Sequence, residues 1–194
     1  MKKLTALLLT VLLISCTSSM QVTKGHNKFR IGGLISVQMN IPSQANTLRY
    51  DIELDSTWYS SEPLTDIGGY GVKLPGIGHW WNYHKVGVNF AIVKKKVGVI
   101  VYPRYYKNYQ NWEGVEDGIY RIINPNETHH LRIDYVNKDD SVHWFIDGLP
   151  VYAERVDLEY LWINNYTPFI GTNGNQYTGR ATAKRTLRMK LKFK

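Results

Sequence analysis

The sequence of 194 residues has a single cysteine, Cys16, so no disulfide can form within the chain. No window keeps helical periodicity for more than two turns, and the best candidate, residues 156–162, is short. The one long apolar run, residues 4–14, is too short to cross a bilayer comfortably. There is no Cys/His zinc spacing, RNP-like string or basic helix, so we expect no nucleic-acid partner. These absences leave a single domain rich in β-structure.

The amino-terminal residues have the pattern of a secretory signal. Lys2 and Lys3 precede the apolar run 4–14, and Cys16 follows the string Leu-Ile-Ser. This string resembles a bacterial lipobox, which implies a lipid on Cys16 and an anchor in the bacterial envelope, at the outer membrane or the periplasmic face. The alternative is a free thiol beside an ordinary cleavage site. The resulting boundaries are a signal peptide at 1–15, a tether at 16–28 and a domain at 29–194.

The charge is basic, with 24 Lys and Arg against 16 Asp and Glu and a net charge of +8. Loss of the signal peptide would remove Lys2 and Lys3 and leave a net charge of +6. Outside the cell, a basic protein favours an acidic polysaccharide or anionic lipid as its partner. The alternative is that the charge only keeps the domain soluble.

Period-two alternation predicts the strands. Leu48, Tyr50, Ile52 and Leu54 alternate with polar residues, and so do residues 187–194 at the end of the chain. Residues 86–93 and 97–102 flank three lysines and predict a hairpin, and residues 131–135 and 142–146 predict two more strands around a turn. Many short strands separated by turn residues indicate an all-β, antiparallel β-sandwich or jelly roll.

Residues 68–77 read Gly-Gly-Tyr-Gly-Val-Lys-Leu-Pro-Gly-Ile. Four glycines and one proline argue against a helix interior or a central strand, so we expect a stiff turn. Such a turn would present Lys73 to an anionic ligand. The alternative is a solvated turn lysine.

This segment resembles the Gly-Gly-Lys-Leu-Pro-Gly-Leu signature of the alginate- and glucuronan-cleaving polysaccharide lyases of families fourteen and twenty. Here Val72 and Ile77 replace a glycine and the final leucine. The resemblance runs from Phe29 to the end of the chain and includes the strings at 144–148 and 166–172. It implies a concanavalin-like jelly roll that cleaves a uronate polymer by β-elimination without a cofactor.

Elimination requires neutralisation of the sugar carboxylate, a base for the C5 proton and an acid for the leaving oxygen. In the lyases that this sequence resembles, these roles fall to the motif lysine, a Ser-x-Arg strand and a Tyr-x-Tyr strand. The resemblance implies catalytic roles for Lys73 and Tyr102. The serine and arginine are absent, with Asn89 the polar residue there, and Arg104 could replace the guanidinium if its strand continues through Pro103. The alternative for Tyr102 is an ordinary strand tyrosine.

Several further side chains are expected to contact sugar. Aromatic rings lie against sugar faces while their polar tips bond hydroxyls. The expected substrate-binding residues are Asn89, Trp80, Trp81, His84, Tyr105 and Tyr106. The histidines lack a ligand spacing, so no metal site is expected.

Two other functions remain open. Asp51, Glu53 and Asp55 share one face of a strand and could serve a glycosidase, although a solvated outer face explains them more simply. A non-catalytic carbohydrate-binding envelope lipoprotein of the same fold is the second alternative, because the Ser-x-Arg pair is missing.

Overall fold

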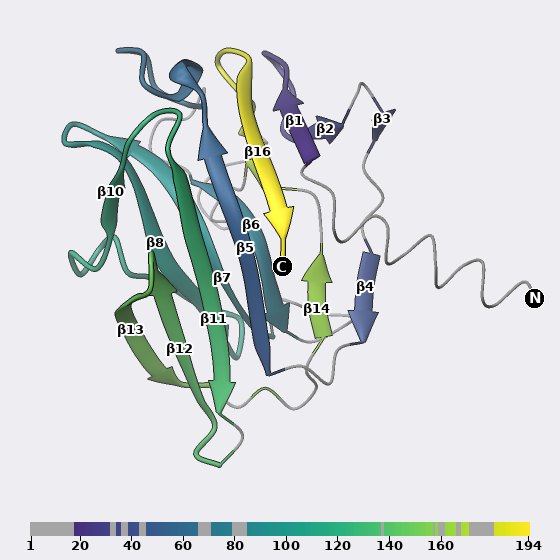
Figure 1. The fold of residues 1–194 in the computed structure, drawn as a ribbon, viewed down its shortest axis with the longest axis vertical. Coiled ribbons are helices and arrows are strands. Elements are labelled where there is room, and N and C mark those ends of the chain that lie inside the picture. The colour runs from purple at the N-terminus through teal and green to yellow at the C-terminus, as the bar shows by residue number, and fades with distance from the viewer. Residues whose placement is uncertain are drawn as a thin grey trace, which may run out of the picture.

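The structure is a computed structural model that describes residues 18–31, 34–35, 39–42, 46–65, 71–78, 85–136, 138–156, 158, 162–165, 168–170 and 181–194. These residues form two antiparallel β-sheets that pack face to face (Figure 1). The predicted all-β sandwich is confirmed. No helix in the described part of the chain is long and apolar enough to span a membrane.

The sheet nearest the viewer in Figure 1 is called the front sheet. Its strands, in spatial order, are β13 (Leu149–Arg155), β12 (Ser141–Ile146), β11 (Thr128–Val136), β5 (Thr47–Leu54), β16 (Leu187–Phe193), β1 (Ser18–Val22), β2 (Arg30–Ile31) and β3 (Leu34–Ile35). A short 3-10 helix, η1 (Ser56–Trp58), follows β5.

The back sheet carries the candidate site. Its strands, in spatial order, are β10 (Arg121–Ile123), β8 (Gly98–Lys107), β7 (Val86–Lys95), β6 (Val72–Gly78), β14 (Trp162–Asn165) and β4 (Met39–Pro42). Two short strands join it at the side: β15 (Phe169–Ile170) pairs with β6, and β9 (Gln110–Glu113) pairs with β8.

The core lies between the sheets and follows the predicted alternation. Leu48, Tyr50, Ile52 and Leu54 are buried on β5, and Trp144 of β12 is fully buried. Two hydrogen bonds cross the sandwich: Trp144 Nε1 donates to the Asn89 carbonyl oxygen at 3.1 Å, and the Tyr50 hydroxyl donates to the Pro75 carbonyl oxygen at 3.1 Å. Because both donors would be costly to bury without partners, these bonds fix how the sheets face each other.

The two predicted hairpins, β7 with β8 and β11 with β12, are confirmed. β7 and β8 pair from Val86 opposite Lys107 to Lys95 opposite Gly98, with the charged tip between them. β12 and β13 are joined by Asp147 and Gly148, whose φ angles are +52° and +78°. Two successive positive φ angles match the type I′ turn, which suits the twist of the flanking strands.

The expected turn at 68–77 is wrong for its second half. Residues 72–78 form β6, an interior strand with β7 on one side and β14 and β15 on the other. The register against β7 shifts between Lys73 and Gly76, so Pro75 falls where the ladder is already interrupted and its missing N–H costs no ladder bond. Residues 66–70 lie outside the described residues.

The expected tether at 16–28 is also wrong for the described part of that segment. β1 pairs with β16 along its whole length, and Met20 and Val22 are buried. Apolar side chains at alternate positions of β1 join the core, so the domain begins by Ser18 rather than at Phe29. Cys16 and the signal-like residues 1–15 lie outside the described residues.

Candidate functional site

The three predicted catalytic residues meet on the outer face of the back sheet. Lys73 on β6 lies opposite Ala91 on β7, which in turn lies opposite Tyr102 on β8. Arg104 lies on the next outward position of β8 and pairs with Asn89. Since alternate residues of a strand share a face, Tyr106 lies on this face as well.

Strand β8 continues through Pro103, as the shared face of Tyr102 and Arg104 requires. The Pro103 carbonyl oxygen accepts a hydrogen bond from the Gly114 backbone at 2.9 Å, outside the β7–β8 ladder. In an extended strand the nitrogen and carbonyl of one residue point to the same side. The proline nitrogen therefore faces the gap between the partners β9 and β10, and the pairing with β7 loses no donor.

Lys73 is a nearly buried amine, with 6% of its surface exposed. Its Nζ donates to the Tyr106 hydroxyl at 2.9 Å and lies 5.3 Å from the centroid of the Phe169 ring. Among the described residues, no carboxylate lies within ion-pair distance of it. Burial, and then the charge of Arg104, lower the pKa of Lys73 to about 7, with Glu113 opposing them.

Arg104 is buried and connects two groups. Its Nε lies 3.0 Å from Glu113 Oε1 in an ion pair, and its Nη2 donates to the Tyr106 hydroxyl. The guanidinium carbon is also 4.5 Å from the centroid of the Tyr106 ring, within cation–π distance. The Tyr106 oxygen therefore accepts hydrogen bonds from both cations of the site. Burial raises the pKa of Tyr106, and Arg104 opposes this rise.

Glu113 accepts hydrogen bonds from two further polar groups of the site. Its Oε2 accepts a hydrogen bond from the Tyr102 hydroxyl at 3.2 Å, and its Oε1 accepts one from Asn111 Nδ2 at 2.9 Å. Burial, and then the Glu113 charge, raise the pKa of Tyr102 well above its usual range. Tyr102 is therefore a protonated donor rather than a ready base.

Sequence reasoning missed Glu113, Asn111 and Phe169. No motif marks the first two, because only the structure shows that Asn108 and Tyr109 form a two-residue turn, both with positive φ. A two-residue loop at that point places Arg104 opposite Glu113 and Tyr106 opposite Asn111. No sequence signal brings Phe169 to Lys73, because their pairing joins distant segments.

The expected sugar contacts divide between two faces. Asn89 is buried and donates to the Leu74 carbonyl oxygen at 3.3 Å, which supports β6 at its irregular point. Tyr105 does not join the site, since it lies on the other face of β8 and stacks on Trp112 with ring centroids 5.0 Å apart. Trp80, Trp81 and His84 lie outside the described residues.

The carboxylates of the glycosidase alternative lie on the other side of the sandwich. Asp51 pairs with Lys194 at 2.9 Å, and Glu53 pairs with Lys190 at 2.7 Å. Asp55 accepts from the Thr57 backbone at 3.0 Å and caps η1. Asp51 and Glu53 therefore have partners on the outer face of the front sheet, and Asp55 has its partner in η1. The described residues contain no group of three or more His, Cys, Asp and Glu side chains that could hold a metal ion.

The sequence matches no family model and no curated protein. Solved structures do match. A β-glucanase from Bacillus licheniformis is 11% identical, with 91% of this chain and 76% of that chain covered and a TM-score of 0.50. Alginate lyase vAL-1 from a Chlorella virus is 12% identical, with 92% and 83% covered and a TM-score of 0.47. A heptameric SAP-like pentraxin from Limulus polyphemus is 12% identical, with 90% and 73% covered and a TM-score of 0.44.

At 11% identity, the match to the β-glucanase shows the fold alone. The protein has the concanavalin-like jelly roll, as expected. Membership of the polysaccharide lyase families stays a prediction that depends on Lys73 and its neighbours.

Proposed function

We propose that the protein binds an acidic, uronate-containing polysaccharide on the outer face of the back sheet and cleaves it by β-elimination. The observation that supports this proposal is Lys73, a nearly buried ammonium whose hydrogen-bond partner is the neutral phenol of Tyr106. A buried charge is costly without a counter-charge, and a ligand carboxylate would supply one.

The neighbouring groups have distinct roles in this proposal. Lys73 and Arg104 neutralise the sugar carboxylate and make the C5 proton more acidic. Tyr106 accepts hydrogen bonds from both cations, which would stabilise its phenolate once the hydroxyl proton has passed to solvent, and this phenolate would take the C5 proton. The resulting phenol can then protonate the leaving oxygen. Tyr102 holds Glu113, and through it Arg104, in place.

The second candidate is a carbohydrate-binding protein of the same fold without catalysis. Glu113 favours it, because this carboxylate already pairs with Arg104 and keeps Tyr102 protonated. Because Glu113 already pairs with Arg104, this guanidinium would stabilise the negative charge that develops on the sugar less strongly. A binder needs only the Lys73 charge and the surrounding polar surface.

One set of assays separates these functions. The purified protein is incubated with alginate and with polyglucuronate, and the ultraviolet absorbance of unsaturated sugar ends is followed. We expect absorbance from wild type and none from Lys73→Met, while Lys95→Met, an exposed lysine of the same sheet, keeps the wild-type rate. Retention on a uronate column without absorbance would identify the binder. New reducing ends without absorbance would identify a glycosidase.

We also propose that Cys16 carries a lipid that holds the domain at the bacterial envelope, as the lipobox-like string suggests. The test is incorporation of labelled palmitate in a bacterial host, with Cys16→Ser as the control. Label in wild type but not in the variant is the expected result. Equal labelling would contradict the proposal.

A further inference from the structure

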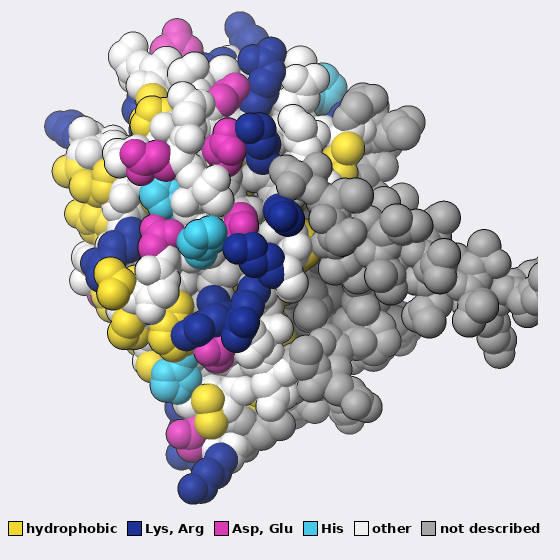
Figure 2. Space-filling model, in the orientation of Figure 1, with side chains coloured by type: hydrophobic (Ala, Val, Ile, Leu, Met, Phe, Trp, Pro, Cys, Tyr) yellow, Lys and Arg dark blue, Asp and Glu magenta, His cyan; other side chains and the backbone are white. Residues whose placement is uncertain are grey.

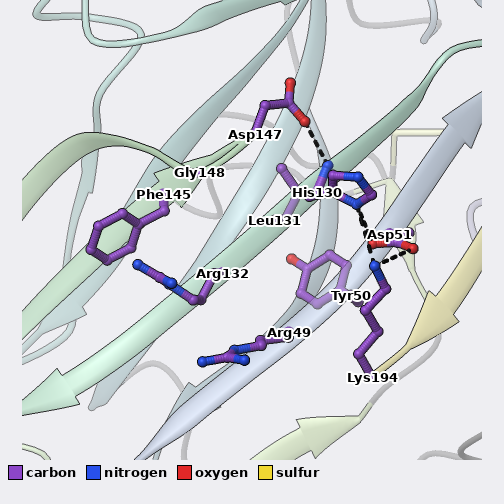
Figure 3. A pocket seen from close by; sticks show the side chains of 10 residues that line it. All are labelled: Arg49, Tyr50, Asp51, His130, Leu131, Arg132, Phe145, Asp147, Gly148 and Lys194. Atoms are coloured by element: carbon purple, nitrogen blue, oxygen red, sulfur yellow. Dashed lines mark hydrogen bonds and ion pairs between the residues drawn. The ribbon is translucent and has the colours of Figure 1, made fainter.

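A pocket of about 390 Å³ opens on the outer face of the front sheet, on the opposite side of the sandwich from Lys73. Strands β5, β11 and β12 and the end of the chain form its walls (Figure 3). Figure 2 shows dark blue Lys and Arg side chains gathered on this face. The pocket uses none of the residues of the Lys73 site.

The pocket is built on one cross-strand row. Arg49 of β5 lies directly opposite Arg132 of β11, and Arg132 lies opposite Phe145 of β12. The backbone N–H of Lys194 donates to the Arg49 carbonyl oxygen at 3.0 Å, which brings a third cationic residue to the row. Like charges directly opposite each other on one face destabilise a sheet, and a bound anion would offset that cost.

Two contacts orient the Arg132 guanidinium. Its guanidinium carbon lies 3.8 Å from the centroid of the Phe145 ring, and its Nε lies 3.1 Å from Asp134 Oδ2. Stacking on a ring and pairing along one edge leave the terminal nitrogens of the planar fork to face a ligand. Such a preorganised guanidinium loses little entropy on binding.

The other charged side chains around the pocket have charged or polar partners, whereas Arg49 adds a positive charge that no carboxylate balances among the described residues. Lys194 Nζ pairs with Asp51 at 2.9 Å, and Arg132 pairs with Asp134. Asp147 accepts from the His130 backbone at 2.7 Å and lies 2.9 Å from His129 Nδ1. The Arg49 side chain is exposed, and it forms no ion pair with another described residue. In Figure 3 the guanidinium groups of Arg49 and Arg132 extend toward the same side of the pocket.

We propose that Arg49 and Arg132 form a second binding site for the acidic polysaccharide and grip one carboxylate or sulfate group between their guanidinium forks. The choice of ligand class rests on the proposed function, whereas the site itself rests on the row described above. Two sites on opposite faces would let one protein hold two chains, or two segments of one chain, and so increase avidity.

The test measures binding of a glucuronate tetrasaccharide to the full chain by calorimetry, together with NMR of the arginine Nε–Hε signals. We expect the oligosaccharide to shift the Arg49 and Arg132 signals. Arg49→Gln should weaken binding of the tetrasaccharide at the Arg49–Arg132 site about tenfold, because the variant loses one charged hydrogen bond to the ligand. The matched control is Arg188→Gln, an exposed arginine on the outer face of the same sheet that is not part of the pocket.

The control variants also separate this site from the Lys73 site. In Lys73→Met, the shifts of the Arg49 and Arg132 signals should persist, and their persistence supports the second site even where no cleavage is found. An equal loss of affinity for the tetrasaccharide in Arg49→Gln and Arg188→Gln would overturn the proposal, because it would show that the ligand responds to the overall positive charge of the face and not to a defined site. Binding to phosphatidylglycerol vesicles that depends on Arg49, with no response to the tetrasaccharide, would overturn it in favour of a lipid surface.

Discussion

A Cβ atom at Gly71 would lie 2.6 Å from the hydroxyl oxygen of Tyr102 and 3.0 Å from the Ile92 carbonyl oxygen. The glycine just before β6 thus leaves the space into which the tyrosine of β8 reaches to bond Glu113. The glycine-rich motif and the distant Tyr102 are therefore one structural unit. The role of this glycine is to allow a close approach.

This contact predicts that Gly71→Ala destabilises the fold by about 1–3 kcal/mol, the usual cost of overpacking. Removing the hydroxyl with Tyr102→Phe relieves the closer contact, so the double variant should lose less than the sum of the two single losses, where Tyr102→Phe alone costs about 1 kcal/mol. Urea unfolding of the four proteins measures this difference. Losses that simply add in the double variant would show that Tyr102 is not the obstacle.

Substitution of Glu113 is expected to lower the free energy of unfolding more than substitution of a surface carboxylate. Glu113→Gln removes the anion that pairs with Arg104, whose side chain is 1% exposed. Breaking a buried ion pair from one side costs about 3–5 kcal/mol. The matched control is Glu53→Gln, which breaks a surface pair with Lys190 and should cost about 1 kcal/mol or less. If urea unfolding gave equal losses of unfolding free energy for Glu113→Gln and Glu53→Gln, the expected effect of burial would be contradicted.

Lys73 should make stability depend on pH. Its pKa of about 7 in the folded protein lies below the ordinary lysine value of 10.5, so between these values the unfolded chain binds more protons. The free energy of unfolding therefore rises with pH through this window. Lys73→Met should be more stable than wild type by on the order of 1–3 kcal/mol below pH 7, and this advantage should shrink toward pH 10. A constant difference across this range would contradict a depressed pKa.

Ligand binding should show the opposite trend. A uronate carboxylate prefers the protonated amine, so affinity should be highest below pH 7 and fall by up to tenfold per pH unit above it. Calorimetry in buffers of different ionisation enthalpy should also detect proton uptake near pH 8. Lys73→Arg should bind with an affinity that does not change between pH 7 and 9. A wild-type affinity equally flat over that range would count against Lys73 as the ligand's partner.

The strands that the sequence predicts well are those with one buried face. Residues 48–54 and 187–193 alternate because their outer faces meet water, and the structure confirms both as strands. β6 has no such alternation, since all its residues are buried, and its glycines and proline indicate a turn. It is nevertheless a strand, because neighbours on both sides supply its hydrogen bonds and a register shift accommodates Pro75.

The same contrast applies to the candidate site. Lys73, Tyr102 and Arg104 could be named because a motif and an i, i+2 spacing are local features. Glu113 could not, since its position opposite Arg104 depends on the turn at Asn108 and Tyr109. The depressed pKa of Lys73 was also invisible, because it depends on burial that only the folded sandwich provides.

β9 carries the carboxylate that balances Arg104, yet β8 is its sole partner among the described strands. Four residue pairs and the stacked ring of Trp112 hold this ribbon at the margin of the sheet. If β9 peeled away, Glu113 would leave with it, while the main β7–β8 ladder could stay intact. Fraying of this one short segment would take Glu113 away from Arg104 and leave the positive charge of the site unopposed by that carboxylate, with no rearrangement of the scaffold.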